Sequence, residues 1–231
     1  MPGFLQKAAA LANPVWEALA TTQAHFNCGD ERLRYFPEDV APFAGLPNWD
    51  EADLQFLTRH LPAGRRFFLL QEKAVEIPDE FEVILQLPLY QMIATGAVMQ
   101  VDGPGIRPLG REDVPRMVAL TRMTRPGPFA ENTIDFGNYV GIFEGEKLIA
   151  MGGERLRVPG YAEVSAICTD PDYRGRNLAT GVLAHVAQGI LDRGEIPFLH
   201  TKTDNAAAIR VYEKIGFEYN REIFFAIIVR R

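Results

Sequence analysis

A short basic loop in the second half of the chain carries residue types that could bind an anion. It consists of Tyr173-Arg174-Gly175-Arg176-Asn177 and precedes a run with apolar residues at helical spacing. The first backbone N–H groups of a helix lack intrahelical partners, and the helix dipole is positive there. Gly175, Asn177 and Ala179 are small or turn-tolerant residues that let backbone amides approach a ligand. The loop therefore predicts a site for a phosphate-bearing ligand, with simple closure of a strand-to-helix turn as the alternative.

The elements that must position this loop follow an alternating order. Runs of β-prone residues predict strands at 106–109, 139–143, 148–154, 163–169 and 196–201, with the last strands in 217–229. Helices are expected at 112–124, in a segment that Arg193-Gly194 ends, and in one that Asp204-Asn205 caps and Gly216 ends. Residues 144–147 predict a hairpin turn. The loop is thus placed between a strand and the N-terminus of a helix.

The first half of the chain predicts a smaller α/β region. Helices are expected at 14–25 and 48–60, and strands at 66–72 and 81–87. Turn residues cluster at 102–105, which predicts a boundary between a region 1–101 and a region 102–231. We recognise no chemical motif in the first region.

Bulk composition excludes several classes of protein. The 231 residues are 47% hydrophobic with a net charge of −6, which argues for a globular protein and against a general nucleic-acid surface. Two cysteines suggest neither a disulfide framework nor a cysteine-rich metal site, and with no export signal they favour the cytoplasm. Residues 83–101 carry no charge, but their interspersed polar residues predict two buried strands joined by a turn rather than a membrane span.

Two spaced patterns in the second half resemble the GNAT superfamily of N-acetyltransferases. Arg174, Asn177 and Ala179 occupy places in that family's acetyl-CoA loop, Arg/Gln-x-x-Gly-x-Gly/Ala, with Asn in place of the usual Gly. Asparagine tolerates left-handed backbone better than other non-glycine residues. A second motif of the family, Asn-x-x-Ala-x-x-x-Tyr-x-x-x-Gly-Phe, is matched by Asn205, Ala208, Tyr212, Gly216 and Phe217. The resemblance covers about residues 104–231.

This resemblance implies an α/β (α+β) fold with a mixed central sheet flanked by helices. Residues 102–231 would form the catalytic domain, and residues 1–101 a degenerate GNAT-like half or an element that shapes the substrate site. Acetyl-CoA would be the acyl donor, without a metal, and a primary amine would attack its thioester directly. The residues implied in holding the cofactor are Ile167, Cys168, Thr169, Arg174, Gly175, Arg176, Asn177, Leu178, Ala179, Thr180 and Asn205.

The same resemblance implies two catalytic residues. Tyr212 matches the tyrosine that protonates the leaving thiolate, although it could instead be a core aromatic residue. Glu163 is the expected base on the central strand, with Glu154 in reserve and an exposed strand position as the alternative for Glu163. Cys168 invites a nucleophile interpretation, but a lone strand cysteine more often acts as a small hydrophobe. His185 and His200 are interpreted as structural.

The acceptor amine cannot be read from the sequence. A small molecule or a peptide would both suit, with no nucleic-acid or membrane partner, and the oligomeric state is not derivable. Residues 125–133 and 157–161 are the expected acceptor loops. Two other functions stay open, namely transfer of a longer acyl or an aminoacyl group, and non-catalytic binding of acyl-CoA.

Overall fold

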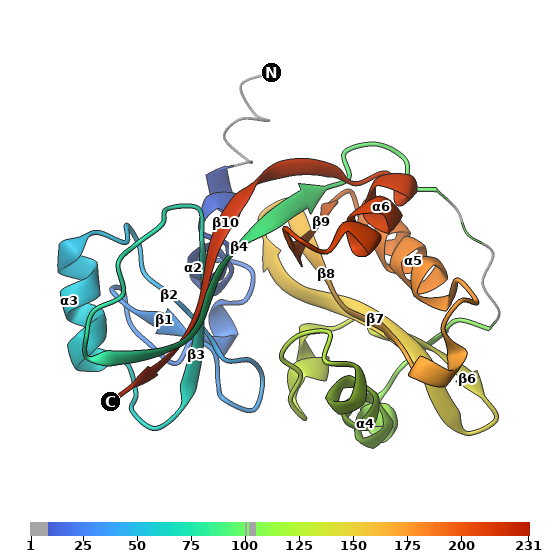
Figure 1. Ribbon diagram of the computed structural model, residues 1–231, viewed down its shortest axis with the longest axis horizontal. Helices are drawn as coiled ribbons and strands as arrows, with labels where there is room; N and C mark the ends of the chain where they lie inside the picture. Colours follow the sequence, from blue (N-terminus) through green and yellow to red (C-terminus); the bar gives the residue numbers. More distant parts are fainter. Residues whose placement is uncertain (1–8, 100, 102–104) are drawn as a thin grey trace.

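The computed structural model of the chain, described here for residues 9–99, 101 and 105–231, contains one ten-stranded sheet with helices on both faces (Figure 1). The strand order is β1-β2-β3-β10-β4-β9-β8-β7-β6-β5. The pairs β2–β3 and β8–β9 are parallel and the other pairs are antiparallel. The predicted class, a mixed sheet flanked by helices, is confirmed.

The elements of the second half follow the predicted order closely. The strands of the chain are β1 (Arg34–Tyr35), β2 (Phe43–Gly45), β3 (Arg66–Gln71), β4 (Phe81–Ile93), β5 (Arg107–Pro108), β6 (Val140–Glu144), β7 (Lys147–Val158), β8 (Tyr161–Thr169), β9 (Ile196–Lys202) and β10 (Glu218–Arg230). The α-helices are α2 (Pro14–Ala20), α3 (Glu51–His60), α4 (Val114–Thr124), α5 (Leu178–Asp192) and α6 (Ala206–Ile215). The predicted helix at 14–25 is therefore shorter than expected.

Strands β4 and β10 join the two halves of the molecule. β10 pairs with β3 along one edge and with β4 along the other, and β4 continues the sheet into β9. The two strands form the arch between the left and right parts of Figure 1. Both sequence regions therefore contribute to one sheet. The expected boundary at 102–105 lies mainly outside the described residues, and the division there stays a prediction.

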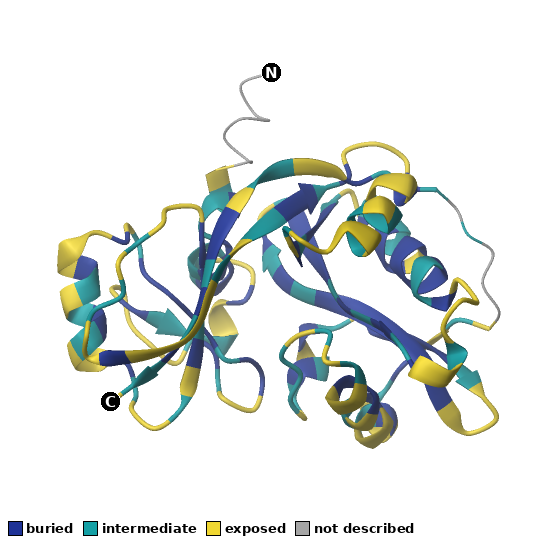
Figure 2. Ribbon diagram, viewed as in Figure 1, coloured by how far each residue is buried: buried dark blue, intermediate teal, exposed yellow. Residues whose placement is uncertain are grey.

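The uncharged segment 83–101 differs from its prediction. It does not form two buried strands joined by a turn, because β4 runs unbroken to Ile93 and pairs with β10 along its length. Val83, Ile84 and Leu85 are 43%, 41% and 38% exposed, at the start of the arch (Figure 2). Apolar β-prone residues form strands wherever a ladder partner exists, even without burial. Likewise, residues 218–230 form one strand rather than several.

Three clusters of buried side chains hold the layers together. One lies between α5 and the sheet and includes Val182, Leu183 and Ile190 of that helix. Another lies between α3 and the sheet and includes Leu57. The third joins the two halves and includes Val15 of α2 together with strand residues of the second half. At the same junction, Gln23 Nε2 donates to the Arg155 carbonyl oxygen at 2.7 Å. No helix among the described residues is long and apolar enough to cross a membrane.

Candidate functional site

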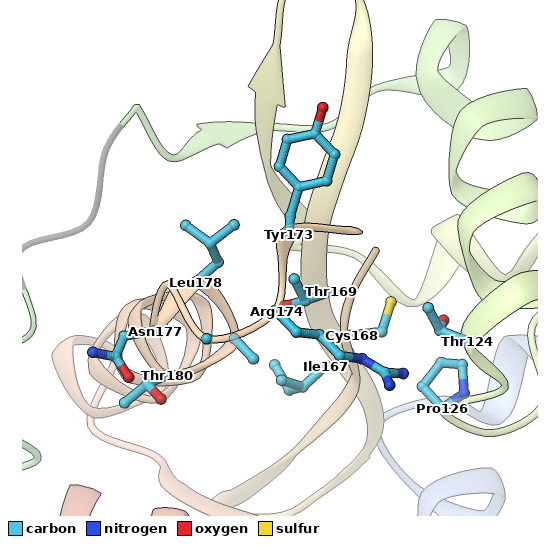
Figure 3. A pocket seen from close by; sticks show the side chains of 12 residues that line it. Thr124, Pro126, Ile167, Cys168, Thr169, Tyr173, Arg174, Asn177, Leu178 and Thr180 are labelled. Atoms are coloured by element: carbon cyan, nitrogen blue, oxygen red, sulfur yellow. The ribbon is translucent and has the colours of Figure 1, made fainter. Parts of the chain in front are cut away.

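A cavity of about 380 Å³ lies where β8 ends and α5 begins (Figure 3). Its lining residues come from the last three residues of β8, the loop that follows, the first turn of α5, and the end of α4. Nine of the residues expected to hold a cofactor line it, namely Ile167, Cys168, Thr169, Arg174, Gly175, Asn177, Leu178, Ala179 and Thr180. Thr124, Pro126 and Tyr173 complete the lining and were not among the expected cofactor residues.

The loop backbone explains why its residue types matter. Gly175 has φ +78°, and Asn177, the residue before α5, has φ +57° and ψ +18°, the left-handed conformation expected for it. The Asn177 side chain makes no capping hydrogen bond, so its contribution is conformational. Leu178, Ala179 and Thr180 form the first turn of α5, where amides lack intrahelical acceptors. Asparagine thus preserves an amide-rich helix start in place of the family's glycine.

Substitutions at Asn177 test this interpretation. Asn177→Ala is expected to destabilise the protein by about 1–2 kcal/mol, because alanine tolerates left-handed backbone poorly. Asn177→Gly should be nearly neutral, since glycine adopts this conformation readily. Chemical denaturation of the two variants measures the difference. Equal stability of the alanine and glycine variants would show that the left-handed conformation carries no cost.

The two parallel strands beside the cavity separate before they end. Their pairing runs from Tyr161↔Ile196 to Glu163↔Phe198, whereas β8 continues to Thr169 and β9 to Lys202. Ala166, just beyond the paired part, has φ +55°, which turns the strand locally. A small cavity of about 70 Å³ lies between the diverging strands. This edge of β8 can therefore offer backbone hydrogen bonds to an extended ligand.

A buried hydroxyl in the first cavity also needs a partner. Thr169 Oγ1 is buried and has no hydrogen-bond partner within the described part of the chain. Buried polar atoms are normally hydrogen-bonded, and exceptions often mark ligand positions. Thr169 lines the cavity, but this oxygen is itself buried and not exposed to it.

The remaining residues of the basic loop take different positions. Arg174 lines the first cavity, and its side chain extends toward Thr124 and Pro126 in Figure 3. Arg176 does not line this cavity, because its guanidinium contacts Glu144 at 3.5 Å and lies 4.8 Å from the Tyr173 ring centroid. Asn205 caps α6 by accepting from the Ala208 amide at 3.3 Å, and it lines a second cavity instead.

Tyr212 lines two of the cavities and is not enclosed within the apolar core alone. It lines both the small cavity at the strand divergence and a second large cavity of about 440 Å³. Burial raises the pKa of its hydroxyl, although a hydrogen bond with Thr201 acts in the opposite direction. The phenol therefore keeps its proton at neutral pH and can donate it.

Glu163 is fully buried and lines none of these cavities. Its carboxylate accepts from Arg155 Nε at 2.8 Å and Nη2 at 2.5 Å, and lies 2.7 Å from His200 Nδ1. Burial alone would raise its pKa, but Arg155 and His200 outweigh burial and lower it to about 2. A carboxylate so placed is a weak base without access to substrate. The geometry instead gives Glu163 the position of a residue that orients Arg155 and His200.

Two further candidates from the sequence are Glu154, the reserve base, and Cys168, a possible nucleophile. Glu154 is buried and accepts two hydrogen bonds from Arg193 Nη2 at 2.8 Å, while Asn138 donates to it at 2.9 Å. It therefore does not line either large cavity. Cys168 does line the first cavity, but burial raises the pKa of its thiol to about 11. A protonated thiol is a poor nucleophile, which agrees with its interpretation as a small hydrophobe.

The second cavity contains functional candidates that the sequence interpretation missed. Arg155 and His200 line it, together with the 125–128 segment of the expected acceptor loop. His200 was interpreted as structural. The sequence did contain an indication that Arg155 has a special role. It is a charged residue in a largely buried strand, and it precedes Glu163 by eight positions, with the turn at Gly160 between them. The other expected acceptor loop, residues 157–161, does not line this cavity.

Comparison with known proteins agrees with this arrangement. The family model described as FR47-like protein matches residues 139–226. The chain is similar to the N-alpha-acetyltransferase RimI of Mycobacterium tuberculosis, at 36% identity over 84 residues that make up 35% of this chain and 52% of that protein. It is also similar to the mycothiol acetyltransferase of Brachybacterium faecium, at 31% identity over 46% of this chain and 34% of that protein. The chain thus spans about half or less of these two relatives.

Solved structures extend the similarity to the whole chain. A crystal structure from Novosphingobium aromaticivorans, assigned to the GNAT family of acetyltransferases, shares 38% identity with a TM-score of 0.89. The match covers 96% of this chain and 98% of that one, so it includes most of the first hundred residues. A GCN5-related N-acetyltransferase from Kribbella flavida, at 15% identity and a TM-score of 0.63, shares the fold.

Proposed function

Because this chain belongs to the GNAT family of acetyltransferases, a family of acyl-transferring enzymes, we propose that it transfers an acetyl group from acetyl-CoA to a primary amine. The observation that carries the proposal is that two cavities meet at Thr124, Pro126 and Ile167, which line both, while Tyr212 lines the second of them. One cavity has the amide-rich helix start and basic loop suited to phosphate, and the other is open to a second substrate. The amine would attack the thioester directly, without an acyl-enzyme intermediate.

The residues of the first cavity fit acetyl-CoA as the donor. When bound, acetyl-CoA supplies an acyl group activated as a thioester. The first turn of α5 and Arg174 would hold the phosphates, and the unpaired edge of β8 would hold the pantetheine arm. Arg176 and Asn205, although among the residues expected to hold the cofactor, have secondary parts in this proposal.

Tyr212 is the proposed general acid. Its hydroxyl stays protonated because burial raises its pKa, and Tyr212 lines the second cavity and the small cavity beside β8, from which Oη would donate a proton to the leaving sulfur. A hydrogen bond with Thr201 orients the ring. Tyr212 is thus the proposed catalytic residue of this chain.

The acceptor amine must also lose a proton. None of the described residues that line the second cavity is a carboxylate, and the Nε2 of His200 lies 3.0 Å from Gln91 Nε2. Gln91 Nε2 also donates to the Leu11 carbonyl oxygen at 2.9 Å, which fixes its identity as the NH₂ group. His200 Nε2 must therefore accept from Gln91, so its lone pair is occupied. We assign Glu163 a positioning role in place of the expected catalytic one, with water in the second cavity taking the proton.

Charge reversal at Arg174 tests the donor site. Arg174 has no ion-pair partner within the described residues, and the chain is acidic overall, so this charge is available to a ligand. Arg174→Glu should weaken CoA binding at least tenfold, with a smaller loss at high salt because charge attraction is screened. Calorimetric titration with CoA measures it. Arg176→Glu is the matched control and should have the smaller effect. Equal losses for both variants would contradict this assignment of the loop.

The decisive experiment is thiol release from acetyl-CoA in the presence of small amines and peptides. Amine-dependent release of CoA, with the acetyl amide identified by mass spectrometry, would support the proposal. Binding of CoA without turnover of any acceptor would favour the non-catalytic alternative. Faster turnover of longer acyl-CoA donors would favour the other alternative, a longer-chain acyltransferase.

Cellular placement and the division of the chain are part of the same proposal. Of the two cysteines, Cys28 is exposed, Cys168 is buried, and both are free thiols, which suits the cytoplasm. Residues 102–231 carry the donor site, while residues 1–101 supply one wall of the acceptor cavity.

A further inference from the structure

The charged side chains among the described residues that line the second cavity are all basic. Arg125, Arg155 and Lys202 line it, and no described residue of the lining is Asp or Glu. Neither Arg125 nor Lys202 has an ion-pair partner within the described residues, and the only carboxylate near Arg155 is Glu163, buried behind it. The cavity of this acidic protein is therefore locally basic. A cationic acceptor such as a polyamine would find no counter-charge there.

Arg155 presents one guanidinium nitrogen toward the cavity. Its Nε and Nη2 donate to Glu163, whereas Nη1 makes no hydrogen bond to any described residue. Nη1 lies on the side of Gly127, 3.7 Å from where a Cβ on that residue would stand, and Gly127 also lines the cavity. Only 11% of the Arg155 side chain is exposed, so an anion that binds it would be largely removed from water. Charge-assisted hydrogen bonds are strongest under these conditions.

A buried hydrogen-bond network fixes this guanidinium in place. Glu163 accepts hydrogen bonds from two of its nitrogens. His200 Nδ1 lies 2.7 Å from the same carboxylate, and Gln91 hydrogen-bonds with His200. Burial lowers the pKa of Arg155, but the attraction of Glu163 outweighs it and the net pKa is raised, so the charge persists. The arginine is thus prepared for a ligand without the entropy loss of a free side chain.

The wall facing these polar groups is apolar and aromatic. It is formed by Phe43, Phe68, Leu70 and Leu89 from the first half of the chain and by Phe225 of β10. The Arg155 guanidinium carbon lies 4.8 Å from the centre of the Phe43 ring, so the cation adjoins this wall. The Phe68 ring contacts Phe43 and Phe225 edge to face, with centroids 5.7 and 5.6 Å apart. Such a wall selects an apolar group.

We propose that the acceptor is a free α-amino acid with an apolar or aromatic side chain, whose carboxylate binds Arg155. The inference rests on the proposed acetyl transfer. The carboxylate would accept from Arg155 Nη1, the side chain would pack on the Phe43–Phe68 wall, and the amine would point toward Tyr212, which the two cavities at the strand divergence share. The nitrogen then forms the new amide bond as the carbon–sulfur bond breaks; the product is an N-acetyl amino acid and CoA.

A peptide N-terminus is the competing acceptor, and the cavity discriminates against it. In a peptide the atoms that would face Arg155 belong to an amide, which carries no charge to match the buried guanidinium. A free amino acid retains its carboxylate. Loss of a charge-assisted hydrogen bond of this kind weakens binding by roughly 10- to 100-fold.

Four acceptors of matched side chain test the proposal with the unmodified protein. L-phenylalanine, L-phenylalaninamide, phenethylamine and a peptide beginning with phenylalanine are compared by kcat/KM in the thiol-release assay. The carboxylate-bearing amino acid should exceed the amide, the amine and the peptide by at least tenfold. Turnover of the amide, the amine or the peptide equal to or above that of the amino acid would overturn the proposal.

Two variants and a binding measurement separate this proposal from the proposed function. Arg155→Lys should raise KM for L-phenylalanine at least tenfold more than KM for phenethylamine, whereas the control Arg193→Lys, which alters a similar pair with buried Glu154, should change the two KM values equally. Calorimetry with L-phenylalanine and phenethylamine is performed in the presence of CoA. Preferential binding of the amino acid without any turnover would retain the anion site and reject acetyl transfer; no preference would reject the anion site, whatever the turnover. If Arg155→Lys does not fold, the four-acceptor comparison decides alone.

Discussion

Replacement of Tyr212 by phenylalanine is expected to reduce kcat by about 10²- to 10⁴-fold, the usual contribution of a general acid. The change removes one hydroxyl and keeps the ring, so packing against Phe217, 6.3 Å away between ring centroids, is retained. Because Tyr212 does not line the first cavity, affinity for CoA should stay within about twofold of wild type. The loss should therefore appear in turnover and not in donor binding.

A matched tyrosine separates the acid role from a general effect of the substitution. Tyr219 is 59% exposed and lies on β10 outside the cavities, so Tyr219→Phe should leave kcat unchanged. The pH profile provides a second readout, since loss of the acid removes the decline of kcat at the alkaline limit where the phenol ionises. A Tyr212→Phe variant with wild-type turnover would eliminate Tyr212 from the mechanism and leave it as an aromatic core residue.

The fold of the second half was predictable because its elements are local. Apolar spacing, Asn205 as a cap and Gly216 as a terminator each specify one helix or its end without reference to distant residues. The left-handed backbone of Asn177 was predictable because the family pattern has glycine there and asparagine tolerates this conformation.

The sheet order was not predictable because it depends on long-range pairing. The local sequence of β10 does not indicate that this strand lies between β3 and β4 in the sheet. The course of β4 was wrong for a related reason. Residues that interrupt the apolar run, such as Gln86 and Pro88, suggested a turn, whereas both pair with residues of β10 within an extended strand.

The candidate site divides in the same way. The proposed donor loop could be located from residue spacing because it is one contiguous segment. The proposed acceptor cavity brings together Phe43, Phe68, Arg155 and Phe225, which are far apart in the sequence, so no local pattern indicates it. Glu163 lies on a strand, β8, as expected. Its residue type alone does not determine its role, because a base and a structural carboxylate differ in their neighbours.

Glutamine in place of Glu163 is expected to lower the free energy of unfolding by about 3–5 kcal/mol at pH 7. The substitution leaves the Arg155 guanidinium buried without its counter-charge, and breaking a buried pair from one side is costly. The matched control is Glu144→Gln, whose ion pair with Arg176 spans 3.5 Å between side chains that are 57% and 56% exposed. That change should cost less than about 1 kcal/mol.

The lowered pKa of Glu163 determines how this loss of stability varies with pH. The carboxyl group of Glu163 has an ordinary pKa of 4.5, and the folded protein lowers it to about 2. A lowered folded-state pKa contributes stability that is fully present above pH 4.5 and is lost as the pH falls toward 2, with a total of about 3 kcal/mol for such a shift. The stability gap between wild type and Glu163→Gln should therefore be widest near pH 7 and narrow below pH 4.5. Urea denaturation at pH 7, 5 and 3.5 measures it, and a gap that stays constant across this range would show that the charge of Glu163 does not stabilise the fold.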